Sequence, residues 1–66
     1  MSYIINLRVN PKDISFINKI FEAYNGLALV TTIDSKLGLI KVNATPQTVY
    51  DVKEILQNLP KQIEFL

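Results

Sequence analysis

The chain uses one kind of strand-to-helix joint twice, and this constrains its fold more than any other feature. Residues 8–11 and, about 35 positions later, residues 41–46 each end a strand-like run and open a helix-like run. Proline suits the first position of a helix because no backbone N–H is needed there, and the preceding Asn10 or Thr45 can cap free amides. Two such units in 66 residues predict a two-layer βαββαβ sandwich.

The hydrophobic periodicity agrees with this element order. Strict alternation is typical of a half-buried strand, whereas apolar residues at helical spacing predict a helix. The pair Asn25-Gly26 is a good helix stop, and Pro60 cannot continue a helix. The predicted elements are strand 3–9, helix 11–24, strands 27–33 and 39–44 joined as a hairpin, helix 46–59 and strand 61–66.

Right-handed crossovers in both halves give an α+β, ferredoxin-like fold over a single domain, residues 1–66. Four antiparallel strands form one sheet, with both helices on one face. The strand residues predicted to face the helices are Ile5, Leu7, Val9, Ile40, Val42, Ile63 and Phe65. For strand 27–33 the pattern does not decide between the face with Leu29 and Thr31 and the face with Val30 and Thr32.

The sheet face without helices is the first place to look for a binding surface. Its candidate residues on the two central strands are Asn6, Arg8, Lys41 and Asn43. Arg8 and Lys41 are predicted to be neighbours there, facing away from the helices. RNA-binding domains of this topology stack bases on aromatic residues of these strands, and none is present here, so nucleic-acid binding through phosphate contacts is a weaker alternative.

The amino-acid composition argues against most kinds of catalysis, metal binding and nucleic-acid binding. The chain has no Cys and no His, which removes thiolate ligands, disulfides and the commonest general base. A net charge of +1 lacks the concentrated basic footprint of nucleic-acid-binding proteins. No apolar run approaches the length of a membrane span. We therefore expect a cytoplasmic protein that is not an enzyme and holds neither metal nor cofactor.

In element order and spacing the chain resembles the ACT domains, which are βαββαβ modules that commonly bind amino acids between two protomers. Residues 10–14 lie where many ACT domains carry their ligand-binding loop, and Pro11 matches that pattern. The resemblance implies a small-molecule site at Asn10, Lys12 and Asp13, near a protomer interface.

A closer resemblance covers nearly the whole chain. Residues 10–14, 22–28 and 34–40 are similar to a family of bacterial proteins of about 70 residues that is classed as a domain of unknown function. These segments are structural joints. The resemblance therefore implies a fold and a bacterial cytoplasmic setting, and no activity.

Self-association has the strongest physical motive. A core this small has no disulfide, and the helix 11–24 carries surplus apolar surface at Phe16, Ile20 and Ala23. In the alternative, Phe16 and Ile20 pack against the second helix within the monomer. We expect a homodimeric, non-enzymatic interaction module; the alternative function is an ACT-like module that binds a small molecule at a protomer interface.

Overall fold

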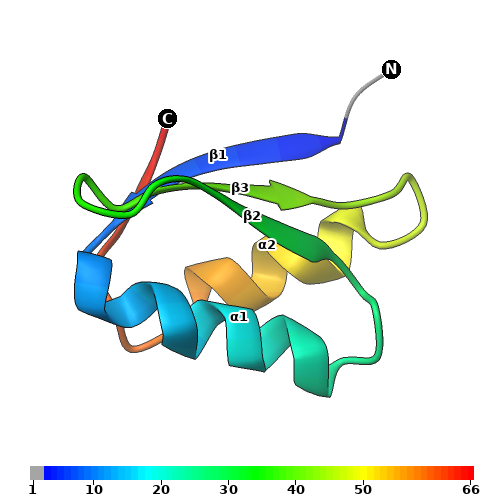
Figure 1. Cartoon of the computed structure of the whole chain (residues 1–66). Helices are drawn as coiled ribbons and strands as arrows, with labels where there is room; N and C mark the ends of the chain where they lie inside the picture. The colour runs from blue at the N-terminus through cyan, green and yellow to red at the C-terminus, as the bar shows by residue number, and fades with distance from the viewer. Residues whose placement is uncertain (1–2) are drawn as a thin grey trace.

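The computed structural model describes residues 3–66, so the first two residues of the predicted domain lie outside the described range. Its elements are β1 (Ile4–Val9), the 3₁₀ turn η1 (Pro11–Asp13), α1 (Ile14–Ala23), β2 (Leu29–Asp34), β3 (Leu39–Asn43), α2 (Val49–Gln57) and β4 (Ile63–Phe65). The antiparallel sheet has the order β2-β3-β1-β4. Both helices cover one of its faces (Figure 1). The predicted ferredoxin-like α+β fold is confirmed.

Both strand-to-helix joints are capped as their sequences predict. The Asn10 side-chain oxygen accepts a hydrogen bond from the Lys12 amide at 3.2 Å. At the second joint, the Thr48 amide donates to Thr45 Oγ1 at 3.2 Å, and the Thr45 amide donates to Thr48 Oγ1 at 2.9 Å. This reciprocal pair is a capping box in which Thr48 takes the place of the usual Glu.

Several element ends differ from the predicted ones. The first helical segment begins as a 3₁₀ turn, and α1 ends at Ala23, so Tyr24 lies beyond the helix that was predicted to include it and is 53% exposed. Residues 46–48 form a turn before α2. That helix stops at Gln57, ahead of Pro60, and at its end the Asn58 side-chain amide donates to the Glu54 carbonyl at 2.7 Å.

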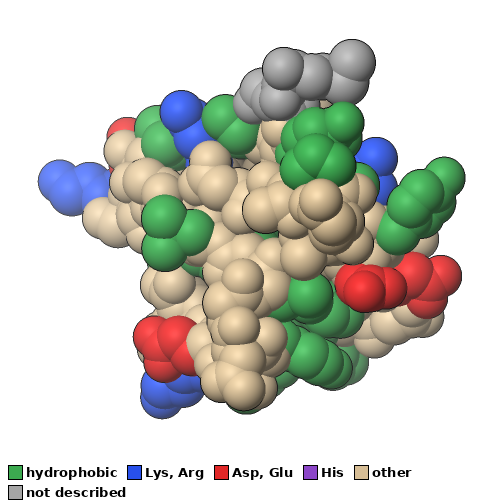
Figure 2. All heavy atoms as spheres, turned by 90° about the vertical axis from the view of Figure 1, so that its right-hand side faces the viewer, with side chains coloured by type: hydrophobic (Ala, Val, Ile, Leu, Met, Phe, Trp, Pro, Cys, Tyr) green, Lys and Arg blue, Asp and Glu red, His purple; other side chains and the backbone are tan. Residues whose placement is uncertain are grey.

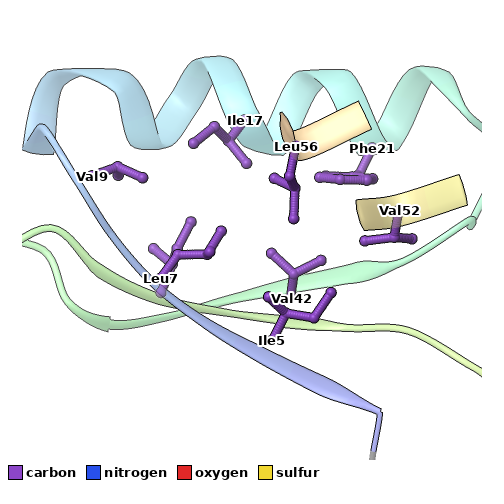
Figure 3. Close-up of a cluster of buried hydrophobic side chains, with 9 residues drawn as sticks. Ile5, Leu7, Val9, Ile17, Phe21, Val42, Val52 and Leu56 are labelled. Atoms are coloured by element: carbon purple, nitrogen blue, oxygen red, sulfur yellow. The ribbon is translucent and has the colours of Figure 1, made fainter. Parts of the chain in front are cut away.

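The core lies between the sheet and the two helices. Side chains from β1 and β3 point at side chains from α1 and α2, as Figure 3 shows. The buried core residues are Ile5, Leu7, Val9, Ile17, Phe21, Ile40, Val42, Val52 and Leu56. Phe65 lies opposite the buried Leu7 and so faces the helices as predicted, but at the end of the edge strand β4 it stays 46% exposed.

The pairing of β2 with β3 assigns the faces of β2. Leu29 lies opposite Asn43 and Thr31 opposite Lys41, which places both on the face without helices. Val30 lies opposite the buried Val42. The register shifts between Thr32 and Asp34, where a β-bulge lies at the end of the strand. None of the helices in residues 3–66 has the length and apolarity that crossing a bilayer requires.

Candidate functional site

The open sheet face carries the four predicted polar residues on its central strands. Asn6 lies opposite Lys41, and Arg8 lies opposite Leu39. Arg8 and Lys41 are therefore diagonal neighbours on adjacent strands, close enough for long side chains to share one surface. Asn43 lies at the far end of this face, opposite Ile4.

Two of these four polar side chains already have partners. Arg8 Nε donates to Glu64 Oε1 at 2.8 Å, and Arg8 Nη2 donates to the same oxygen. Both side chains of this ion pair are more than half exposed, so its net contribution to stability is small. The Asn43 side-chain amide donates to the Leu29 carbonyl at 3.1 Å and to Thr31 Oγ1 at 3.3 Å, which ties β3 to β2. The other two, Asn6 and Lys41, lie opposite each other and have no hydrogen bond or ion pair between side chains within residues 3–66.

Exposed apolar residues surround the polar ones. Ile4 and Leu29 are exposed on this face, and Leu29 is 69% exposed. Leu66, whose amide donates to the Asn6 carbonyl at 2.9 Å, is exposed at the β4 edge. Exposed apolar side chains gathered on one face are typical of an interaction surface rather than a catalytic one.

The loop at the predicted ligand site uses its backbone amides internally. The Lys12 amide donates to the Asn10 side chain, and the Asp13 amide donates to the Asn10 carbonyl at 2.8 Å. The Asp13 side chain is largely buried, and its carboxylate lies 3.5 Å from Lys61 Nζ. A shallow hollow of about 440 Å³ near this loop is lined by Arg8, Val9, Asn10, Gln62, Ile63 and Glu64. It brings Arg8 and Asn10 together and includes neither Lys12 nor Asp13.

The three predicted self-association residues lie in different surroundings. Phe16 is half-buried against the core, and Lys61 Nζ lies 5.1 Å from the centroid of its ring. Ile20 is half-buried and faces α2 across a hollow that Ile55 also lines. Ala23 is exposed. Of the three, Phe16 packs against the core of the monomer, whereas Ile20 and Ala23 do not.

The feature that sequence reasoning missed is the free edge of β2. β2 ends the sheet on one side, and its residues 29–33 carry neither a charge nor a Pro; its charged residue Asp34 and its bulge lie at the end of the strand. Charged residues and prolines are the usual means by which edge strands avoid pairing with another chain. The uncharged composition of residues 27–33 was the available signal. The predicted fold, with strands 3–9 and 39–44 at the centre of the sheet, already implied that this strand is an edge, and the two facts together mark the edge as free for pairing.

The hydrogen-bonding pattern determines which β2 groups face outward. The Val9 amide donates to the Gly38 carbonyl at 2.8 Å, which marks a bonded pair at the end of the β1–β3 ladder. Bonded and non-bonded pairs alternate along antiparallel strands, so Ile40 and Val42 direct their backbone groups toward β1 and Lys41 directs its groups toward β2. Thr31 is the partner of Lys41, so it directs its backbone groups toward β3. Val30 and Thr32 therefore direct their N–H and C=O groups to the free edge.

Among residues 3–66, no group of three or more acidic, His or Cys side chains could hold a metal ion.

One protein family, described as a domain of unknown function (DUF4911), matches residues 7–63. The chain belongs to this family. No curated protein and no solved structure matches the chain.

Proposed function

We propose that this protein is a non-enzymatic assembly module that forms a homodimer by pairing the β2 edges of two copies. The observation that carries the proposal is the free edge of β2. This strand lies at the edge of a small domain and has no Lys, Arg or Pro. Antiparallel pairing across a twofold axis joins the two sheets into one and satisfies backbone groups that otherwise face solvent.

The β2 edge is self-complementary in its hydrogen bonds. With the twofold axis at Thr31, Val30 of one copy lies opposite Thr32 of the other. These are the residues whose backbone groups face outward, so both pairs form bonded pairs. Thr31 then lies opposite its own symmetry mate in a non-bonded pair, and no like charges oppose each other at these positions.

The neighbouring helix is compatible with the same symmetry. The side of α1 next to the β2 edge lines a hollow with Thr32 and Ser35, and its charged residues there are Lys19 and Glu22. In a twofold arrangement the two copies of α1 lie antiparallel. Lys19 and Glu22 lie about one helical turn apart, so Lys19 of one copy can face Glu22 of the other across the axis, which favours association.

The first test is sedimentation of the natural chain and of Thr31→Glu at about 10 µM, because oligomerisation depends on concentration. We expect the natural chain at twice its 7.5 kDa mass. Glu at position 31 faces Lys41 within its own chain, which preserves the monomer, but opposes another Glu across the axis. We expect the dimer dissociation constant to rise by about tenfold or more.

Gln57→Glu is the matched control, because it adds the same charge on an exposed position of α2, away from the sheet. It should leave the dimer unchanged. A natural chain that sediments only at 7.5 kDa contradicts the proposal. The alternative, an ACT-like small-molecule module, has less support because the loop amides of Lys12 and Asp13 are already donated to Asn10.

A further inference from the structure

Two adjoining hollows lie in the helix layer, between α1 and α2. One, of about 410 Å³, is lined by Tyr24, Leu27, Asp51, Glu54 and Ile55. The other, of about 310 Å³, is lined by Ile20, Tyr24, Glu54, Ile55, Asn58 and Leu59. Because they share Tyr24, Glu54 and Ile55, they form one continuous surface, which we call the acidic groove.

The floor of the acidic groove is apolar. Leu27, Ile55 and Leu59 are half-buried in it, and the aromatic ring of Tyr24 stands at its side, half exposed. Figure 2 shows the end of the molecule where α1 ends and α2 begins, with hydrophobic side chains exposed beside acidic ones. Partly buried aromatic and aliphatic side chains in a concave surface are the usual anchor positions of protein interfaces.

The rim of the acidic groove carries only negative charge. Asp51 and Glu54 are exposed, and no Lys or Arg lines either hollow in the described part of the chain. Neither carboxylate forms an ion pair with any residue in the range 3–66. The chain as a whole has a net charge of +1, so this negative rim is a local feature. It attracts a partner with positive charges beside its apolar anchors.

The two hollows follow one another along α2. Asp51 lines only the first, Asn58 and Leu59 line only the second, and Glu54 and Ile55 line both. From Asp51 to Asn58 the helix rises by about 10 Å, or two turns. Apolar side chains at positions i, i+4 and i+7 of a partner helix span a similar length, so such a helix can lie along the groove.

We propose that the acidic groove binds a short, basic, amphipathic helix of another protein. A second copy of this chain fits it poorly, because twofold docking of groove on groove sets Asp51 and Glu54 against the same carboxylates. The groove lies in the helix layer, whereas the β2 edge belongs to the sheet, so one molecule can use both surfaces. The assembly module then gains a partner class: proteins that display a Leu- and Lys-rich helical segment.

The test uses the full chain and a fluorescein-labelled peptide of about 14 residues, with Leu on one helical face and Lys elsewhere. Its twin carries Glu in place of every Lys. Fluorescence anisotropy should show saturable binding of the Lys peptide, weakened by added salt, and at least about tenfold weaker binding of the Glu peptide.

Variants then locate the site. Tyr24→Ala should weaken binding of the Lys peptide by about tenfold, as expected for an aromatic anchor. Tyr50→Ala is the matched control, because Tyr50 is 82% exposed on α2 and lines neither hollow. The double variant Asp51→Lys/Glu54→Lys should reverse the preference and favour the Glu peptide, which loss of packing alone cannot do.

Three results would overturn the proposal: no binding of the Lys peptide, equal binding of both peptides, or equal losses for the Tyr24 and Tyr50 variants. If Tyr24→Ala changes sedimentation of the chain alone, the occupant is a second copy and the proposal is wrong. The homodimer proposal is judged separately by Thr31→Glu, since Thr31 lies on the open sheet face and Tyr24 at the end of α1.

Discussion

At the scale of single residues, Gly38 is the least replaceable position in the hairpin. Its φ is +72°, and a Cβ placed on it would lie 1.7 Å from the Val9 carbonyl oxygen. Backbone atoms cannot move aside as a flexible side chain can. Its own carbonyl also accepts the Val9 amide, so a shift here breaks the end of the β1–β3 ladder.

We expect Gly38→Ala to lower the free energy of unfolding by about 3 kcal/mol or more, from backbone strain and from the steric clash together. Gly26→Ala separates these two causes. Gly26 has a similar φ of +79°, but nothing lies within 4 Å of its added Cβ. We expect Gly26→Ala to lower the free energy of unfolding by about 1 kcal/mol. Urea unfolding of both variants measures the difference, and equal losses would show that the clash with Val9 is relieved.

Residue-level chemistry was the part most open to prediction. Capping is decided by a few neighbouring residues, so Asn10 and Thr45 could be identified as caps from the sequence. Tyr24 could not be placed, because its position on a helical wheel assumes that the helix continues to it. The partner of Arg8 could not be foreseen either, since Glu64 lies 56 residues away on another strand.

At the scale of elements, α2 depends on the capping box at its start. Thr45 and Thr48 exchange two backbone-to-side-chain hydrogen bonds, and their hydroxyl oxygens lie 3.1 Å apart. The Val49 amide donates to the Thr45 carbonyl at 2.9 Å, as in the first turn of a helix. A helix of nine residues has little stability of its own, so its start matters.

Thr45→Ala should therefore cost about 1 kcal/mol of the free energy of unfolding, because it removes the acceptor for the Thr48 amide. Thr45→Ser keeps the hydroxyl and should restore most of this loss. Urea unfolding followed by circular dichroism gives both values, and the dependence on urea should be the same for both variants. A Ser variant as unstable as the Ala variant would mean that the hydroxyl is not the stabilising group.

The order of elements and the hairpin were predictable, and the register of β2 was not. Alternation and breaker residues identify strands and helices locally. In β2 both faces carry apolar and Thr residues, so the pattern is equally compatible with either register. The register of Thr31 opposite Lys41 follows from the hairpin and its bulge. The acidic groove could not be derived from the sequence, because it depends on how separate elements meet in space.

At the scale of the whole molecule, the two proposed surfaces belong to different layers. The β2 edge offers backbone hydrogen bonds and takes an identical partner, whereas the acidic groove offers an apolar floor with an acidic rim and takes a basic one. A dimer formed through the sheet edges leaves both copies of the groove accessible. Such a dimer is bivalent, and it binds a partner with two suitable helices more tightly than a monomer can.

The absence of Cys from the chain allows a direct test of the twofold register. With the axis at Thr31, the two Cα atoms of that residue form a non-bonded pair about 4.5 Å apart, within the range of disulfide geometry. Thr31→Cys should therefore form a disulfide-linked dimer under mild oxidation, seen on a non-reducing gel. Tyr50→Cys, on the exposed side of α2, should remain mostly unlinked. If the Thr31→Cys variant sediments as a dimer and yet does not cross-link, the proposed register is wrong, whereas the proposal that the chain forms a homodimer still holds.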